Sequence, residues 1–145
     1  MQTVVVAVRG NMRFPYKGSG IGLVYNNSIL LGKRSKRPFK GLWSVPGGGF
    51  EKDKDKDYLS GAKRELYEET AIILDKLDTS YIGKWTLKLP FFCWTTFFYK
   101  IENFDVELKP NEFEQLEWVS LNNTIKKHLR PFTKSEVNYL KKILN

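Results

Sequence analysis

Three glutamates recur in the sequence at the spacing of a single helical turn. Glu65, Glu68 and Glu69 stand at positions i, i+3 and i+4, so a helix over this segment places their carboxylates on one face. Like charges at this spacing repel unless a cation lies between them, and Arg64 can neutralise only one. A hard cation such as Mg²⁺ binds a few carboxylates and keeps waters for phosphate ligands. The segment therefore predicts a metal site; the alternative is a solvated acidic face.

A glycine turn and an amphipathic helix are expected to position these carboxylates. Residues 47–49 are three consecutive glycines, which suit a turn that takes a positive φ or approaches a ligand closely. The helix is expected to begin near Asp57, because apolar residues recur after it at three- and four-residue steps: Leu59, Ala62 and Leu66.

The stretch 47–72 resembles the Nudix box, written Gx5Ex7REUxEExGU with U aliphatic. The match is carried by Gly48, Arg64, Glu65, Leu66, Glu68, Glu69 and Ile72. The stretch preceding the box also matches a Gly-x-Trp-x-x-Pro-Gly-Gly pattern common in this family, through Gly41, Trp43, Pro46, Gly47 and Gly48.

The box departs from the pattern in two places. The segment between Gly48 and Arg64 is two residues longer, so Lys54 stands where the first glutamate belongs. Ala71 replaces the last glycine, which should make the left-handed conformation at the helix end less accessible. We expect an aspartate to substitute for the missing glutamate, the candidates being Asp53, Asp55 and Asp57.

The resemblance implies an α/β fold, the Nudix-type α/β/α sandwich with a mixed β-sheet, as a single domain over residues 1–145. It implies hydrolysis of a phosphoanhydride in a nucleoside diphosphate linked to X, where the compound is a nucleotide sugar, ADP-ribose or a (d)NTP. The implied cofactor is Mg²⁺ or Mn²⁺. The implied ligands are Glu65, Glu68, Glu69 and the Gly47 carbonyl.

The resemblance also suggests the remaining catalytic groups. Nudix proteins often carry an acid shortly before a Glu-Trp-Val strand, and here Glu112 precedes such a strand, so Glu65 or Glu112 is the candidate base. Arg64 would orient a glutamate of the box. Attack at phosphorus is favoured over the attack at carbon of the GDP-mannose mannosyl hydrolase branch, although the run 30–38 locally resembles that branch.

Four residues are expected to contact substrate. Arg34 and Arg37 lie in a basic cluster, and a guanidinium fork suits phosphate, although the same cluster could be a solvated strand edge. Gly48 lies where the backbone approaches the ligand. Trp94 could stack on a nucleobase, although core packing is the favoured interpretation for it.

Composition bounds the remaining possibilities. The chain has 145 residues, of which 41% are hydrophobic and 14% aromatic, typical of one globular domain. Its net charge of +8 favours an anionic partner. The lone cysteine, Cys93, excludes an internal disulfide and is expected to be buried, in a reducing compartment. No signal peptide or membrane span is evident, so we expect a cytoplasmic enzyme without a membrane partner.

Further elements are expected along the chain. Asn26-Asn27 predicts a tight hairpin between strands 21–25 and 28–32. Thr133 to Glu136 has the form of a capping box at the start of a last helix. The other expectations are a strand at 3–9, a loop at 11–18, strands at 79–87 and 91–101, and a short helical segment that begins near residue 123.

Two functional alternatives stay open at this point. One is glycosyl hydrolysis of the GDP-mannose type. The other is a non-catalytic Nudix domain that binds nucleotide or RNA, with nucleic acid a less favoured partner than a nucleotide or nucleotide sugar. A homodimer is a further open expectation. The only histidine, His128, lies in a basic run and is expected at the surface, which argues against histidine-based catalysis.

Overall fold

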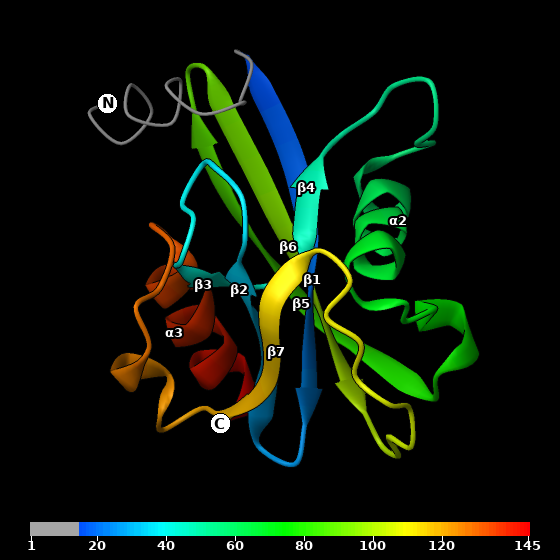
Figure 1. Ribbon diagram of the computed structural model, residues 1–145, viewed down its shortest axis with the longest axis vertical. Helices are drawn as coiled ribbons and strands as arrows, with labels where there is room; N and C mark the ends of the chain where they lie inside the picture. The colour runs from blue at the N-terminus through cyan, green and yellow to red at the C-terminus, as the bar shows by residue number, and fades with distance from the viewer. Residues whose placement is uncertain (1–14) are drawn as a thin grey trace.

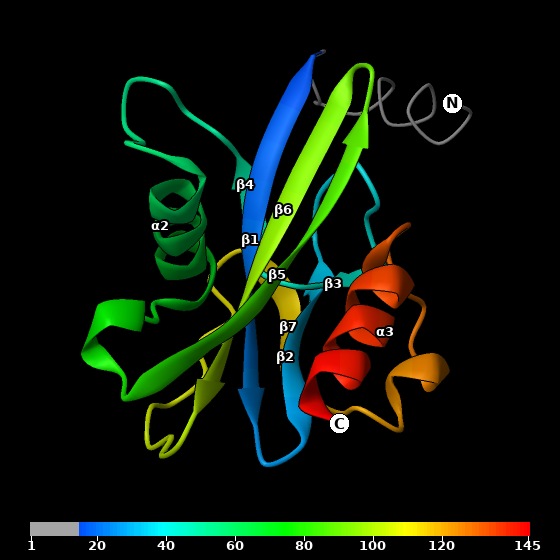
Figure 2. The ribbon, with the colours of Figure 1, turned by 180° about the vertical axis from the view of Figure 1, so that it is seen from behind.

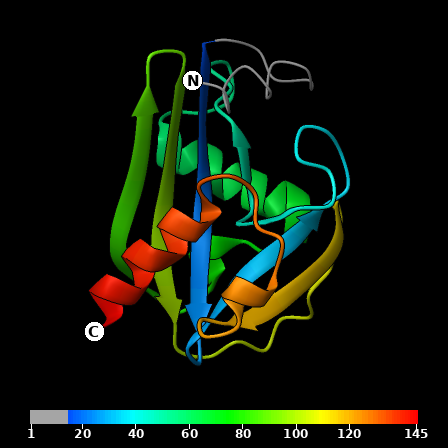
Figure 3. The same cartoon turned by 90° about the vertical axis from the view of Figure 1, so that its left-hand side faces the viewer.

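The structure is a computed structural model that describes residues 15–145. Within them, a mixed sheet of seven strands lies between the helices α2 (Tyr58–Thr70) and α3 (Thr133–Leu144) (Figure 1). Figure 3 looks past α3 onto the sheet, with α2 behind it, and Figure 2 shows the same layers from the back. The expected α/β/α sandwich is confirmed. The strand expected at 3–9 lies outside the described residues.

The sheet is organised around the long strand β1. One edge of β1 pairs along its length with the parallel strand β6, and the other edge pairs with β4 and then with β2. The outer strands are β5 beside β6, and β3 and β7 beside β2. The strands are β1 (Tyr16–Tyr25), β2 (Ser28–Arg34), β3 (Trp43–Ser44), β4 (Gly47–Gly49), β5 (Thr79–Leu89), β6 (Phe92–Ile101) and β7 (Phe113–Ser120).

The hairpin between β1 and β2 is confirmed, whereas the loop expected at 11–18 is wrong for its last residues. Asn26 and Asn27 take φ angles of 48° and 58°, as a tight turn requires. Strand β1 already begins at Tyr16. A Cβ at Gly18 would lie 2.8 Å from the Gly48 carbonyl oxygen, so this glycine serves the close approach of β4 rather than a loop.

Two apolar cores lie on opposite faces of the sheet. Val137 and Leu140 of α3 pack in one core, and Ala62 and Leu66 of α2 pack in the other. Cys93 is half-buried, which corrects the expectation of a buried residue. No helix among residues 15–145 is long and apolar enough to cross a membrane.

The two ends of α2 are held by different groups. Asp57 is the N-cap, and its carboxylate accepts a hydrogen bond of 2.8 Å from the Ser60 amide. Ala71 takes the left-handed conformation with φ 64°, and its amide donates to the Tyr67 carbonyl. The expectation that alanine would disfavour this conformation is therefore wrong here.

The capping box expected at the start of α3 is also wrong. The N-cap is Phe132, which makes no side-chain capping bond, and Thr133 is already the first helical residue. The Glu136 carboxylate does not fold back onto the helix end but points into the interior, where Thr96 donates a hydrogen bond to it. The segment before α3 contains only the short 3-10 helix η2 (Thr124–Lys126).

Candidate active site

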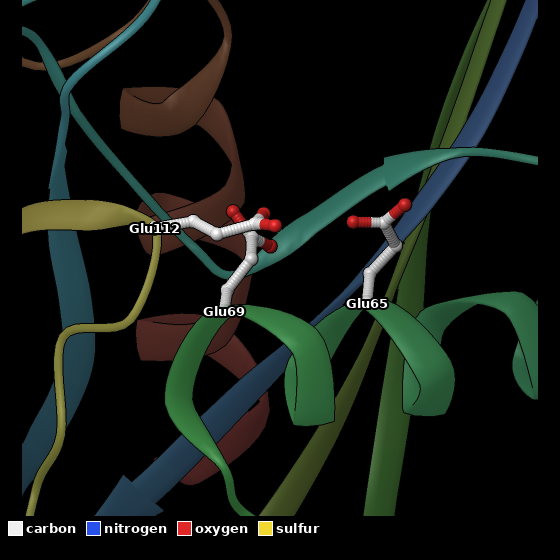
Figure 4. Close-up of side chains that lie close together, drawn as sticks. All are labelled: Glu65, Glu69 and Glu112. Atoms are coloured by element: carbon white, nitrogen blue, oxygen red, sulfur yellow. The ribbon is translucent and has the colours of Figure 1, made fainter.

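Three carboxylates from two separate segments meet beside β4. One oxygen from each of Glu65, Glu69 and Glu112 lies within 4.8 Å of the others. Glu65 and Glu69 project from successive turns of α2, and Glu112 reaches across from the loop before β7 (Figure 4). The helix therefore supplies two of the three carboxylates, and a segment distant in sequence supplies the third.

The environment of these carboxylates favours a bound cation. Glu69 is only 6% exposed, and burial raises its pKa well above the usual value, although the Gly47 amide donates to it at 2.7 Å. Burial also raises the pKa of Glu65 to about 7. A cation would relieve the cost of these charges, and an all-oxygen donor set suits a hard divalent ion. The residues present fit such a metal.

The first two residues of strand β4 are glycines where a side chain would clash. A Cβ on Gly48 would lie 2.5 Å from the carboxyl carbon of Glu65, and one on Gly47 would lie 2.5 Å from the Ser19 carbonyl oxygen. Both contacts are too short for real atoms. The glycines therefore let the backbone pass directly over the carboxylates.

Arg64 gathers the acids around the start of the site. Its Nε and Nη2 donate to the two oxygens of Asp55 at 2.8 and 2.9 Å, and Nη1 donates to Glu68 at 3.1 Å. Nη1 also lies 2.9 Å from a carboxylate oxygen of Glu51. Among the three candidate aspartates, Asp55 thus pairs with the box arginine, while Asp57 caps the helix.

Glu68 lies apart from the three-carboxylate cluster. Its side chain is 39% exposed and is paired with Arg64. The predicted set of helix glutamates is therefore divided in the structure. Glu65 and Glu69 lie with Glu112, whereas Glu68 pairs with Arg64, which also donates to Glu65 at 3.2 Å.

A pocket of about 250 Å³ opens over the carboxylates. Arg34 lines it and is half-buried, whereas Arg37 is exposed and does not line it. Trp94 also lines it but is only 2% exposed, and its Nε1 donates to Thr96. The lining residues are Tyr16, Arg34, Pro38, Phe39, Gly47, Gly48, Gly49, Glu65, Glu69, Phe92, Trp94, Glu112, Arg130 and Phe132.

The profile of the NUDIX domain family matches residues 16–140. The chain belongs to the Nudix family. The prediction of a Nudix hydrolase is confirmed by this match, by the fold and by a relative named for pyrophosphohydrolase activity. That relative is an RNA pyrophosphohydrolase of Pelagibacter ubique, 30% identical over 72% of this chain and 77% of its own length.

Other similar proteins are named for different roles. An ADPR-responsive transcriptional repressor of Acinetobacter baylyi is 30% identical over 68% of this chain, which spans only 40% of that protein. The Nudix domain of Shewanella oneidensis NrtR, solved with ADP-ribose, has a TM-score of 0.70 at 18% identity, covering 90% of this chain and 88% of that one. A bifunctional NMN adenylyltransferase/ADP-ribose pyrophosphatase of Francisella tularensis, solved with AMP and a Mn ion, has a TM-score of 0.77 at 18% identity. That match covers 97% of this chain and 45% of the other.

Sequence reasoning missed several residues that line the pocket of this Nudix domain. Arg130 was not among the expected site residues, and Tyr16 was expected to lie in a loop. Burial raises the pKa of Tyr16 to about 12, and both Arg130 and Glu65 act on it electrostatically. The Arg130-Pro131 pair signalled a chain turn, but nothing local placed this arginine in the pocket.

The raised pKa values predict how the metal-free Nudix domain responds to pH. Glu65 has a folded-state pKa of about 7 against 4.5. Its contribution to stability is therefore complete below pH 4.5 and is lost as the pH rises through 7. The free energy of unfolding is measured in urea with a chelator. Between pH 4.5 and 7 we expect it to fall by roughly 3 kcal/mol less in Glu65→Gln than in the native protein. Equal slopes of stability against pH in both proteins would contradict the assignment.

Proposed function

We propose that this Nudix hydrolase cleaves a phosphoanhydride in a nucleoside diphosphate linked to X, with Mg²⁺ or Mn²⁺ as cofactor. The observation that carries the proposal is the meeting of Glu65, Glu69 and Glu112 on a pocket that Arg34 also lines. Such a pocket offers carboxylates for a metal and a guanidinium for a phosphate. The activities for which similar proteins are named, on RNA and on ADP-ribose, are compatible with it.

The residues proposed to hold the metal are Glu65, Glu69 and Glu112, together with the carbonyl of Gly47. Glu68, predicted from the box, is an alternative ligand that would first have to leave its pairing with Arg64. A bound divalent metal polarises phosphate oxygens and lowers the pKa of water.

The remaining roles fall to side chains around the pocket. Glu65 or Glu112, whichever is not bound to the metal during the reaction, is proposed as the base, because a carboxylate can accept a proton from a water whose pKa a metal has lowered. Arg64 is proposed as a positioning residue that fixes the loop through Asp55. Gly48 lets Glu65 reach the pocket.

The proposal specifies attack at phosphorus. Products are tested by hydrolysis in H₂¹⁸O of a panel of (d)NTPs, ADP-ribose, nucleotide sugars and dinucleoside polyphosphates, with Mg²⁺ and with Mn²⁺. We expect metal-dependent release with the label in a phosphate. Label in the sugar, with no phosphate on the sugar product, would instead establish glycosyl hydrolysis of the GDP-mannose type.

The two arginines of the basic cluster give a further prediction. Arg34 lines the pocket, with its Nε donating to the Pro38 carbonyl at 2.9 Å, whereas Arg37 is exposed. We expect Arg34→Gln to raise KM about tenfold, because a charge-assisted contact to phosphate is lost. Arg37→Gln is the matched control and should leave KM nearly unchanged. An equal effect of both changes would point to long-range attraction rather than contact.

A binding-only domain is the second candidate, favoured by the ADPR-responsive repressor among the relatives. Nucleotide binding without hydrolysis of any panel compound would support it. Four further predictions from the sequence are kept as predictions: a single domain over 1–145, stacking of a base on Trp94, a cytoplasmic location and a homodimer.

A further inference from the structure

The pocket has a second part whose chemistry differs from that of the carboxylates. Tyr16 stacks on Phe92 with ring centroids 5.4 Å apart, and Phe132 lies 5.6 Å from Phe92 and 5.8 Å from Trp94. We call these four residues the aromatic wall. Aromatic surfaces suit a flat ligand such as a nucleobase better than a phosphate group.

Arg130 is built into the aromatic wall. Its guanidinium carbon lies 4.6 Å from the ring centre of Trp94 and 4.3 Å from that of Phe132, and the residue is only 4% exposed. Its Nη2 donates to Glu136 at 3.2 Å, and its Nε has no partner among the described residues. A guanidinium carries five N–H donors, and the donor on Nε is one that the described residues leave without a partner.

A buried network fixes this arginine. Glu136 is fully buried and accepts hydrogen bonds from Arg130 and from Thr96, whose hydroxyl in turn accepts from Trp94 Nε1. Glu136 supplies the counter-charge, so the attraction of Arg130 for a second anion is weakened. Arg130 keeps its N–H donors, and these suit uncharged acceptor atoms on a ligand.

The aromatic wall and the three carboxylates line the same pocket. Tyr16 also lies beside β4, because a Cβ on Gly49 would lie 3.6 Å from its ring, and Arg130 lines the same pocket. A nucleotide whose phosphates lie at the carboxylates can therefore extend its base along the aromatic wall toward Arg130.

The donors of an arginine discriminate among bases. Guanine and other 6-oxopurines present two adjacent acceptors, O6 and N7, which an arginine can contact together. Adenine presents one acceptor beside an amino group that also donates, so it meets an arginine less well.

We propose that the aromatic wall binds the base of the substrate and that Arg130 donates to its acceptor edge, which selects 6-oxopurine nucleotides over adenine nucleotides. Arg130 is then a specificity-determining residue, and Glu136 positions it. This inference rests on the proposed function for the nucleotide nature of the substrate.

The test measures binding rather than turnover. The full chain is titrated calorimetrically, without metal, with GMP, AMP and 7-deaza-GMP, which lacks the N7 acceptor. We expect GMP to bind about 10- to 100-fold more tightly than AMP, with 7-deaza-GMP weaker than GMP. Binding of AMP as tight as that of GMP would overturn the inference.

Variants assign the preference to Arg130. Arg130→Gln alone would leave Glu136 buried without a counter-charge and would destabilise the fold. The double change Arg130→Gln with Glu136→Gln removes both charges, and we expect it to abolish the preference for GMP in a protein that still melts cooperatively. Arg34→Gln is the matched control, which should weaken GMP and AMP equally. A folded double variant that keeps the preference, or an Arg34 variant that loses it, would overturn the assignment.

The inference and the proposed function can fail separately. A GMP preference that depends on Arg130, in a protein that hydrolyses no panel compound, would support the inference and overturn the proposed function. Hydrolysis of a panel compound together with equal binding of GMP and AMP would support the proposed function and overturn the inference.

Discussion

Glu69→Gln should lower kcat for metal-dependent hydrolysis by about 10²- to 10³-fold, because a metal contributes several kcal/mol of transition-state stabilisation. The amide keeps the size of the side chain and an oxygen that can accept from the Gly47 amide, now 2.7 Å from the carboxylate. What it removes is the charge in a buried place beside Glu65 and Glu112. Initial rates at saturating Mg²⁺ and Mn²⁺ measure the effect.

The same change should have an opposite effect on the metal-free fold. Burial raises the pKa of Glu69, so its charged form opposes folding at neutral pH. Glutamine has no proton to lose, and we expect the chelated variant to melt at a higher temperature than the chelated native protein. Loss of activity together with gain of metal-free stability is the signature of a ligand carboxylate rather than of a damaged fold.

Glu68→Gln is the matched control from the same helix. Glu68 is part-exposed, paired with Arg64 and outside the cluster of three carboxylates, so its change should lower kcat by less than about tenfold. A loss as large as that of Glu69→Gln would indicate that Glu68 is a metal ligand, as the box pattern alone predicts. Little loss in either variant would contradict the proposed metal mechanism.

Asp55→Asn should have the largest effect on stability, a loss of about 3 kcal/mol, because it removes one partner of a buried ion pair. The Asp55 side chain is only 1% exposed, and it accepts two hydrogen bonds from Arg64. Its second oxygen also accepts from the Glu51 amide, which closes the loop onto the helix. Because Arg64 would lose its main anchor, kcat should fall by about 10- to 100-fold.

The dependence of this effect on pH has a fixed sign. The hydrogen bonds from Arg64 hold the pKa of Asp55 below its usual value of 3.8. The stabilisation is therefore complete above pH 3.8 and is lost as the pH falls through the folded-state pKa. Urea unfolding of native and Asp55→Asn protein should converge in acid and differ most near neutrality.

Asp53→Asn is the matched control, because Asp53 is an exposed aspartate in the same loop. It should change stability by less than about 0.5 kcal/mol. If Asp53→Asn were instead the more destabilising change, the assignment of Asp55 as the acid that replaces the first glutamate of the box would be wrong.

The sequence by itself determined the elements whose signals are local. The helix over the box follows from the spacing of Ala62 and Leu66, and the first hairpin from Asn26-Asn27, because periodicity and turn chemistry act between near neighbours. The pairing of glycines with glutamates in the box was sufficient to identify the family. The loop predicted at 11–18 is wrong at residues 16–18, because glycine occurs both in loops and where strands approach closely.

Only the tertiary structure decided which of these groups meet. Asp53, Asp55 and Asp57 are equivalent in the sequence, and the path of one loop selects Asp55 for Arg64. The sequence suggested Glu112 as a base, but only the packing of β7 against β2 brings it to the helix glutamates.

The contact between Arg130 and Glu136 is also one that the local sequence does not show. Locally, Glu136 completes a capping motif and Arg130 precedes a proline, and both signals concern the chain direction alone. Packing of α3 against the sheet buries the pair instead beside Trp94 of β6. A buried charge is stable only where its partner is also placed, and that placement depends on segments that the local sequence does not connect.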